Sequence, residues 1–201
     1  MSDDSTAIKN APAPFSGVPD QEGNIPNSDL IIRASDGVDL HVHRDILMFI
    51  SVFFKNILDG SGSLDAERDG KPVVCLSEDS TVMHRLLCIA YPGRSLDSVT
   101  AQILDGICGV HEAAQKYLFT GAMKLLEKML EHPALLNVHP HRVFAIARIR
   151  DLPDLARKAA LVTLSRGVCP PALDFPELEL LPAATFQALH NFHYACGESA
   201  K

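Results

Sequence analysis

The sequence predicts an α+β fold, because strand patterns lead the ordered part of the chain and helical patterns dominate after them. The β-branched run at 30–32 and the alternating segment at 38–42 flank an Asp36-Gly37 turn, which predicts a β-hairpin. The continuous apolar run at 73–76 predicts a third, buried strand. We therefore expect a small, mainly N-terminal sheet flanked by a helical cluster and followed by an all-α extension.

The helices are predicted from apolar residues that recur at spacings of three and four. One such pattern runs from Arg44 to Leu58, and Ser51 divides it into two short helices. Proline and glycine stops delimit the later ones. Six further helices are predicted, at about 80–90, 97–117, 121–130, 142–149, 152–164 and 182–194.

Length and composition indicate one domain with an extension, or two small domains. The chain has 201 residues, of which 47% are hydrophobic, which is too apolar for a disordered protein. Its formal net charge of -7 argues against a general nucleic-acid binder. Residues 139–166 depart from this balance, with five Arg and one Lys against two Asp. These cations form a solvated helix face, pair with acids elsewhere, or bind an acidic protein partner; nucleic acid is the less favoured ligand.

Cysteine usage and the N-terminus favour a protein of a reducing compartment. The five cysteines are far apart and never form C-x-x-C, so we expect neither a disulfide framework nor a zinc site. The N-terminus is acidic where a signal peptide would be basic, and no apolar run is long enough to span a membrane. We expect a soluble protein of the cytoplasm, the nucleus or both, with no cofactor and no membrane partner.

The domain organisation follows from the composition along the chain. Residues 1–26 are polar and proline-rich, which predicts a disordered tail. We expect the main domain over 27–131, a helical extension over 132–195 and a short C-terminal tail over 196–201.

Several segments in order resemble one known family. These are Asp29-Leu30-Ile31-Ile32, His41 to Leu47, Ser51-Val52-Phe53-Phe54, Val74-Cys75-Leu76, Ile89 to Gly93 and Ala113-Ala114-Gln115-Lys116-Tyr117. Together they resemble the BTB/POZ domain over 27–131. Residues 132–195 are similar to the BACK-like extension of short fungal BTB proteins.

The resemblance implies a homodimer with a charged pocket at its interface, to which Asp29, Arg44 and Leu47 correspond. The alternative is that Asp29 caps a strand and Arg44 is solvated, with little effect on stability. Leu47, Phe53 and Phe54 belong either to the core or to the dimer face, and their spacing does not separate these.

The resemblance also implies an adaptor that brings a substrate to a cullin-type ubiquitin ligase. The corresponding partner-binding surface comprises Phe54, Ile57, Leu58, Leu64 and Glu67. The hydrophobic-x-Glu motif of such adaptors is not in its usual spacing, because Ala66 stands where Glu is expected. Alternatives are pairing with another BTB protein, or a transcription or chromatin regulator that recruits corepressors.

No catalytic motif accompanies these features, so we expect no enzyme. His43-Arg44-Asp45 spells a kinase triplet, but Ile50 occupies the position that requires Asn. The pair His41 and His43, and the set His190, His193 and Cys196, are incomplete as metal sites. Glu177 and Glu179 lie in a proline-flanked turn, where we expect solvated charge.

Overall fold

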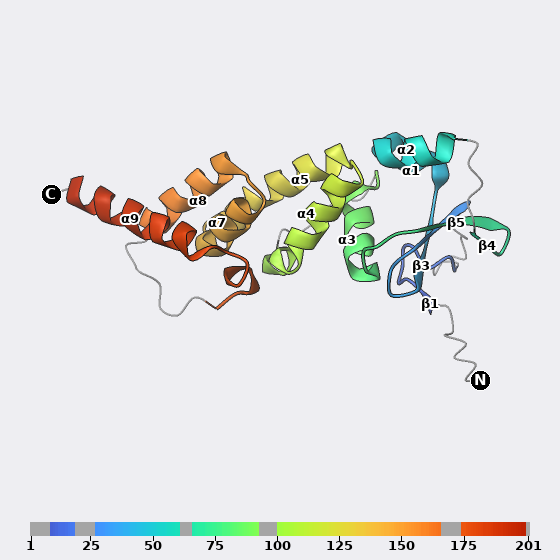
Figure 1. The fold of residues 1–201 in the computed structure, drawn as a ribbon, viewed down its shortest axis with the longest axis horizontal. Coiled ribbons are helices and arrows are strands. Elements are labelled where there is room, and N and C mark those ends of the chain that lie inside the picture. Colours follow the sequence, from blue (N-terminus) through green and yellow to red (C-terminus); the bar gives the residue numbers. More distant parts are fainter. Residues whose placement is uncertain (1–8, 19–26, 61–65, 93–99, 166–173, 200–201) are drawn as a thin grey trace. The chain divides into compact units, whose positions relative to one another are not determined.

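The computed structural model places the chain in two compact units (Figure 1). It describes residues 9–18, 27–60, 66–92, 100–165 and 174–199. Unit 1 comprises 1–95 and 109–124, and unit 2 comprises 96–108 and 125–201. Within the described segments, no helix is both long enough and apolar enough to cross a lipid bilayer.

Unit 1 contains a five-stranded mixed sheet with the strand order β1-β3-β2-β5-β4. The strands are β1 (Lys9–Asn10), β2 (Leu30–Arg33), β3 (Val38–Val42), β4 (Ala66–Arg68) and β5 (Lys71–Cys75). The predicted hairpin is confirmed, since β2 and β3 are antiparallel with Ile31 opposite His41. The predicted third strand is confirmed as β5, which lies parallel to β2.

The centre of this sheet is apolar on both faces, as the β-branched run predicts. Leu30, Ile31 and Ile32 are fully buried, and so are Leu40 and Val42 on the neighbouring strand. Burial of both faces explains why β2 reads as a continuous apolar run rather than an alternating one.

The prediction of a disordered tail over 1–26 is wrong for residues 9–18. β1 pairs in parallel with β3, and the backbone N–H of Ala11 donates to the Asp39 carbonyl at 2.8 Å. The N–H of His41 donates to the Phe15 carbonyl at 2.9 Å, and Phe15 itself is buried. The polar, proline-rich composition conceals two apolar anchors, Ala11 and Phe15, on a segment that completes the hydrogen bonding of β3.

The first helical pattern forms α1 (Arg44–Ile50) and α2 (Val52–Asp59), divided at Ser51 as predicted. The Ser51 N–H donates to the Leu47 carbonyl, which closes α1. The Ser51 hydroxyl accepts from the Phe54 N–H at 3.1 Å, which caps α2. One residue therefore ends one helix and begins the next.

The helices that follow β5 in the chain agree with the prediction except in one place. They are α3 (Ser80–Ala90), α4 (Ile107–Lys116) and α5 (Thr120–Leu130). The single helix expected over 97–117 is wrong, because a short 3-10 helix, η1 (Ala101–Leu104), precedes α4. Gly106 between them has a φ of +67°, a left-handed conformation that interrupts a helix and that apolar spacing does not reveal. Residues 93–99 lie outside the described part.

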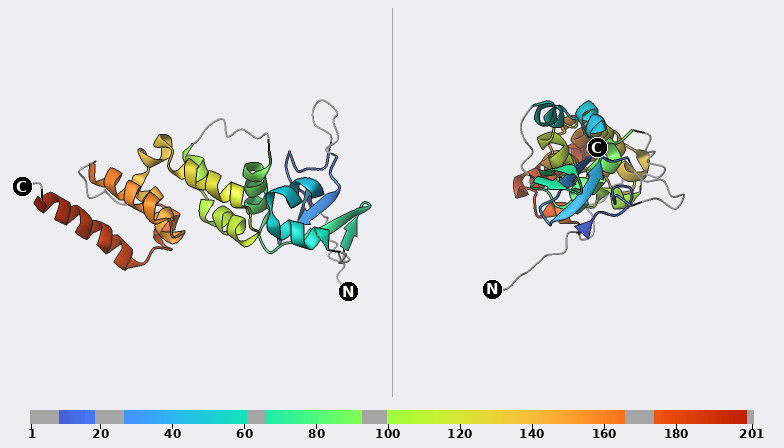
Figure 2. Two further views of the ribbon diagram at one scale, coloured as in Figure 1. Left: turned by 90° about the horizontal axis from the view of Figure 1, so that it is seen from above. Right: turned by 90° about the vertical axis from the view of Figure 1, so that its right-hand side faces the viewer.

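Unit 2 is helical in its described residues. It contains η1 and the end of α5, followed by α6 (Pro133–Leu136), α7 (Pro140–Ile149), α8 (Pro153–Ser165), η2 (Pro176–Leu178) and α9 (Ala183–Ser199). Figure 2 shows α9, in red, alongside α7 and α8. The three predicted helices are confirmed, and two short elements, α6 and η2, are additions. The predicted C-terminal tail over 196–201 is wrong for 196–199, which continue α9.

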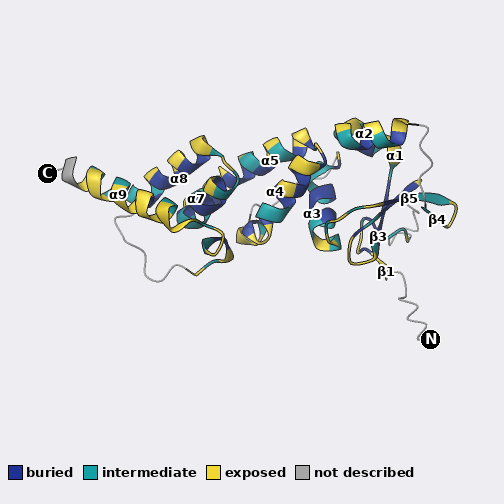
Figure 3. Ribbon diagram, viewed as in Figure 1, coloured by how far each residue is buried: buried dark blue, intermediate teal, exposed yellow. Residues whose placement is uncertain are grey.

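Burial differs sharply among these helices (Figure 3). Residues 143–147 of α7 are all buried, whereas Leu189 is the one buried position among 183–197 of α9. α7 is thus the central helix of unit 2, and α9 covers it only in part.

Candidate protein-interaction surface

Helix α1 buries one apolar side chain and exposes another two residues away. Leu47 is fully buried, while Phe49 is 88% exposed. Residues two apart point to nearly opposite sides of a helix, so the turn that anchors Leu47 in the core directs Phe49 outward. Phe49 is the most exposed large apolar side chain among the described residues.

Other apolar side chains accompany Phe49 on α1 and α2. Ile46 and Ile50 are half-buried, and Val52 is 55% exposed. We call Ile46, Phe49, Ile50 and Val52 the α1–α2 face. The sequence contains no charged residue between Asp45 and Lys55. Exposed apolar side chains at neighbouring helix positions are typical of a protein-binding site.

An aromatic cluster holds the inner side of these helices in place. The ring of Phe54 contacts those of Phe53, Tyr117 and Phe119, with centroids 5.3, 6.1 and 5.8 Å away. The Ser51 hydroxyl donates to the Tyr117 carbonyl at 2.7 Å. The α1–α2 face is therefore carried by a rigid support, which lowers the entropic cost of binding.

The structure brings Asp29 and Arg44 together, but through the backbone. The Asp29 carboxylate accepts from the Arg44 N–H at 2.8 Å, while the Arg44 guanidinium donates to the Leu58 carbonyl. Asp29 thus satisfies a free N–H at the start of α1, where a negative charge is favourable. Of the two alternatives for Leu47, the structure places it in the core of the chain. The assignment of Asp29 and Arg44 to a dimer pocket stays a prediction.

Some of the residues predicted to bind a partner lie in the core, and others are accessible. Phe54 and Leu58 are buried core residues, so their placement on a partner surface is wrong. Ile57 is half-buried and Glu67, on β4, is exposed. Leu64 lies outside the described residues.

Sequence reasoning missed Phe49 and Val52, because no local pattern separates their apolar side chains from those of the core. The structure makes the separation: Leu47 on α1 and Phe54 and Leu58 on α2 are buried, whereas Phe49 and Val52 are exposed.

The histidine patterns do not assemble a metal site. Among the described residues, no group of three or more His, Cys, Asp and Glu side chains could hold a metal ion. His41 is buried, and its burial together with the nearby charges of Lys71 and Arg68 lowers its pKa. His43 contributes its backbone N–H, which donates to the Tyr91 hydroxyl at 2.9 Å.

In unit 2, the expectation that Glu177 is solvated is wrong. Its carboxylate is buried and accepts from Arg142 Nε and Nη2 at 2.8 and 3.0 Å. Burial lowers the pKa of Arg142, but the hydrogen bonds that it donates to Glu177 and Asp105 outweigh burial and raise that pKa overall. Lys158 likewise pairs with Glu131 at 2.8 Å. Part of the basic stretch 139–166 is therefore neutralised within unit 2.

A small mixed sheet, a helical cluster and an exposed apolar helix face together define a protein-interaction domain. The family model of the BTB/POZ domain matches residues 20–134, more than half of the chain. The chain therefore belongs to the BTB/POZ domain family, and the resemblance seen in the sequence is confirmed. No curated protein matches it. BTB/POZ domains are generally protein-interaction modules rather than enzymes.

Proposed function

We propose that this protein self-associates through the α1–α2 face. The observation that carries the proposal is the 88% exposure of Phe49 on a helix whose other side is fixed in the core. BTB domains commonly mediate self-association, which supports a second copy of the chain as the partner. Complete burial of one such side chain contributes about 1.5–3 kcal/mol.

A two-fold symmetric dimer uses this face efficiently. In a two-fold interface the patch of one copy packs against the same patch of the other copy. Each exposed apolar residue of the patch is therefore buried in both copies. Phe49 would form the apolar centre, and the charges of Asp45 and Lys55, at either end of the uncharged run, would remain at the wet rim.

Light scattering after size exclusion, at tens of micromolar protein, tests the proposal. We expect the native chain to elute as a dimer and Phe49→Asp as a folded monomer whose circular dichroism spectrum matches that of the native chain. Leu161→Asp is the matched control, because Leu161 on α8 is 52% exposed and outside the α1–α2 face. A monomeric native chain, or a dimeric Phe49→Asp variant, would contradict the proposal.

A second candidate function is recruitment of a cullin as a ligase adaptor. It is favoured by the accessibility of Ile57 and Glu67, two residues of the surface that the resemblance implies. We expect purified cullin to bind the native chain and to bind Glu67→Lys more weakly. Absence of binding by the native chain removes this candidate and leaves the dimer proposal unaffected.

A further inference from the structure

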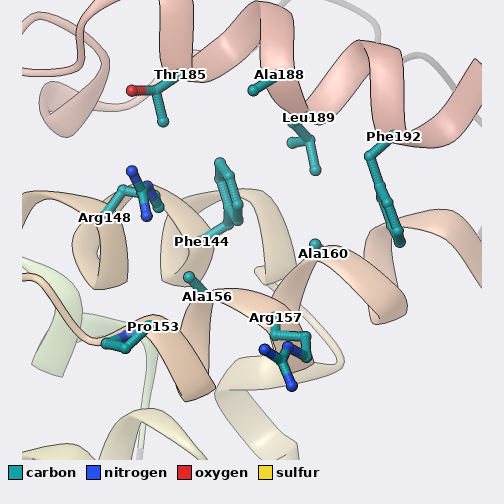
Figure 4. Close-up of a pocket in the computed structure, with 10 residues that line it drawn as sticks. All are labelled: Phe144, Arg148, Pro153, Ala156, Arg157, Ala160, Thr185, Ala188, Leu189 and Phe192. Carbon is teal, nitrogen blue, oxygen red and sulfur yellow. The ribbon is translucent and has the colours of Figure 1, made fainter.

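A cavity of about 440 Å³ lies in unit 2 between α7, α8 and α9 (Figure 4). Its size falls within the range of pockets that bind small organic molecules. Phe144 from α7 and Leu189 and Phe192 from α9 provide its bulky apolar lining.

The cavity exists because small residues occupy the facing positions. Ala156 and Ala160 on α8 and Ala188 on α9 line it, where larger side chains would fill the space between the helices. Phe144 and Leu189, which line the cavity, are themselves 7% and 5% exposed, and Phe192 is half-buried.

The cavity is lined by two cations of the basic stretch, Arg148 and Arg157, that have no carboxylate partner among the described residues. Arg142 and Lys158 are paired with acids, as described above, and Arg150 makes other contacts. Arg148 and Arg157 form no ion pair with any described residue, and both line the cavity. None of its ten lining residues is acidic. An anion would therefore be favoured there.

The polar and apolar groups are separated along the cavity. Figure 4 shows Arg148 and Thr185 toward one end and Phe192 toward the other, with Phe144 and Leu189 between them. In the same view, the Arg157 side chain extends from α8 toward the side away from α9. A ligand that matches this arrangement has a charged head and an apolar body.

We propose that this cavity binds a small amphipathic carboxylate, such as a medium-chain fatty acid anion. Its head contacts the Arg148 guanidinium and the Thr185 hydroxyl, which both donate hydrogen bonds to a carboxylate. Its chain follows Phe144 and Leu189 toward Phe192. Arg157 adds a second positive charge that favours the anion. The site is independent of the α1–α2 face.

Titration of the full chain with decanoate below its micelle concentration, followed by calorimetry, tests the site. We expect saturable binding of one decanoate per chain. Octanoate, shorter by two methylenes, should bind roughly tenfold more weakly. Decanol lacks the charge and should also bind about tenfold more weakly. Equal affinity for decanoate and decanol would overturn the assignment of an anion site.

Matched variants distinguish binding in the cavity from a general effect of positive charge on the surface. Arg148→Gln with Arg157→Gln should weaken decanoate binding at least tenfold, whereas Lys158→Gln, a cation of the same stretch outside the cavity, should not. Ala188→Leu fills the cavity and should abolish binding, while Ala184→Leu, on the same helix outside it, should not.

Three further results would overturn the proposal. They are no saturable decanoate binding, equal losses in Lys158→Gln and the double arginine variant, and binding of a short Asp- and Phe-containing peptide without binding of decanoate. The last result would reassign the cavity to an acidic peptide. If the native chain proved to be a monomer, the decanoate titration would still test the cavity, because the site lies within unit 2 of a single chain.

Discussion

Arg142 on α7 donates two hydrogen bonds to the buried carboxylate of Glu177, 35 residues further along the chain. A third contact joins Arg142 Nη2 to the exposed carboxylate of Asp105 at 2.9 Å. One guanidinium therefore connects the segment after η1, the central helix and η2, all within unit 2.

We expect Arg142→Met to destabilise unit 2 by about 3–5 kcal/mol, because it leaves the Glu177 carboxylate buried without a compensating charge. The measurement is urea unfolding followed by circular dichroism. Asp105→Asn is the control, since Asp105 is 68% exposed and should change stability by less than about 1 kcal/mol. Glu177→Leu combined with Arg142→Met should recover much of the loss, and equal loss in the single and double variants would refute this account.

The environment of Asp39 predicts that unit 1 loses stability in acid. Its carboxylate is fully buried, which raises its pKa, but hydrogen bonds from Arg33 and Arg68 outweigh burial and lower the pKa below the usual 3.8. A group whose pKa is lower in the folded chain than in the unfolded chain stabilises the fold at pH values above its unfolded-state pKa. That stability is lost as the pH falls through the folded-state pKa. We expect the native chain to lose stability steeply below pH 3.8.

Asp39→Asn should be less stable than the native chain at neutral pH. It should also lose less stability than the native chain when the pH falls below 3.8. Thermal unfolding at a series of pH values measures this. Asp69→Asn serves as the comparison, because Asp69 is 72% exposed and contacts Arg68 only at 3.3 Å. A parallel acid response of Asp39→Asn and the native chain would show that other carboxylates dominate.

Gly17 is needed for the N-terminal segment to dock on β3. A Cβ atom there would lie 2.5 Å from His41 Cδ2, and the φ of +70° is itself unfavourable for other residues. We expect Gly17→Ala to detach residues 11–18, which would remove the protection of the Ala11 and His41 amides from hydrogen exchange. Gly37→Ala is the matched control: its φ is +76° but nothing lies within 4 Å of the added atom. Retained protection in Gly17→Ala would mean that the His41 ring moves instead.

Short sequence patterns predicted the helices and strands that depend mainly on residues close together in the chain. The Asp36-Gly37 turn identified the β2–β3 hairpin, and the Ser51 division of the α1–α2 segment follows from a side chain that caps its own helix. The segment 9–18 escaped prediction because its order depends on β3, nearly thirty residues away. No local pattern encodes such a backbone pairing.

The functional surfaces were harder to predict than the fold for a related reason. A hydrophobic residue reads the same whether it faces the core or a partner, so Phe54 and Phe49 were not distinguished. The buried Glu177 escaped because its partner, Arg142, is remote in sequence. The basic stretch was recognised from its composition, but only the structure shows which of its described arginines pair with acids.

Ser51 carries the last prediction, because its hydroxyl makes two contacts at once. It accepts from the Phe54 N–H and donates to the Tyr117 carbonyl, and the residue is 1% exposed. Ser51→Ala removes a helix cap and leaves a buried carbonyl without its donor, so we expect a loss of about 1.5–4 kcal/mol in urea unfolding. Asp79→Ala isolates the capping contribution, because Asp79 caps α3 from an exposed position and should cost about 1 kcal/mol. Equal losses in the two variants would show that the Tyr117 contact adds nothing. A larger loss in Ser51→Ala would establish that the α1–α2 face depends on its contact with the end of α4.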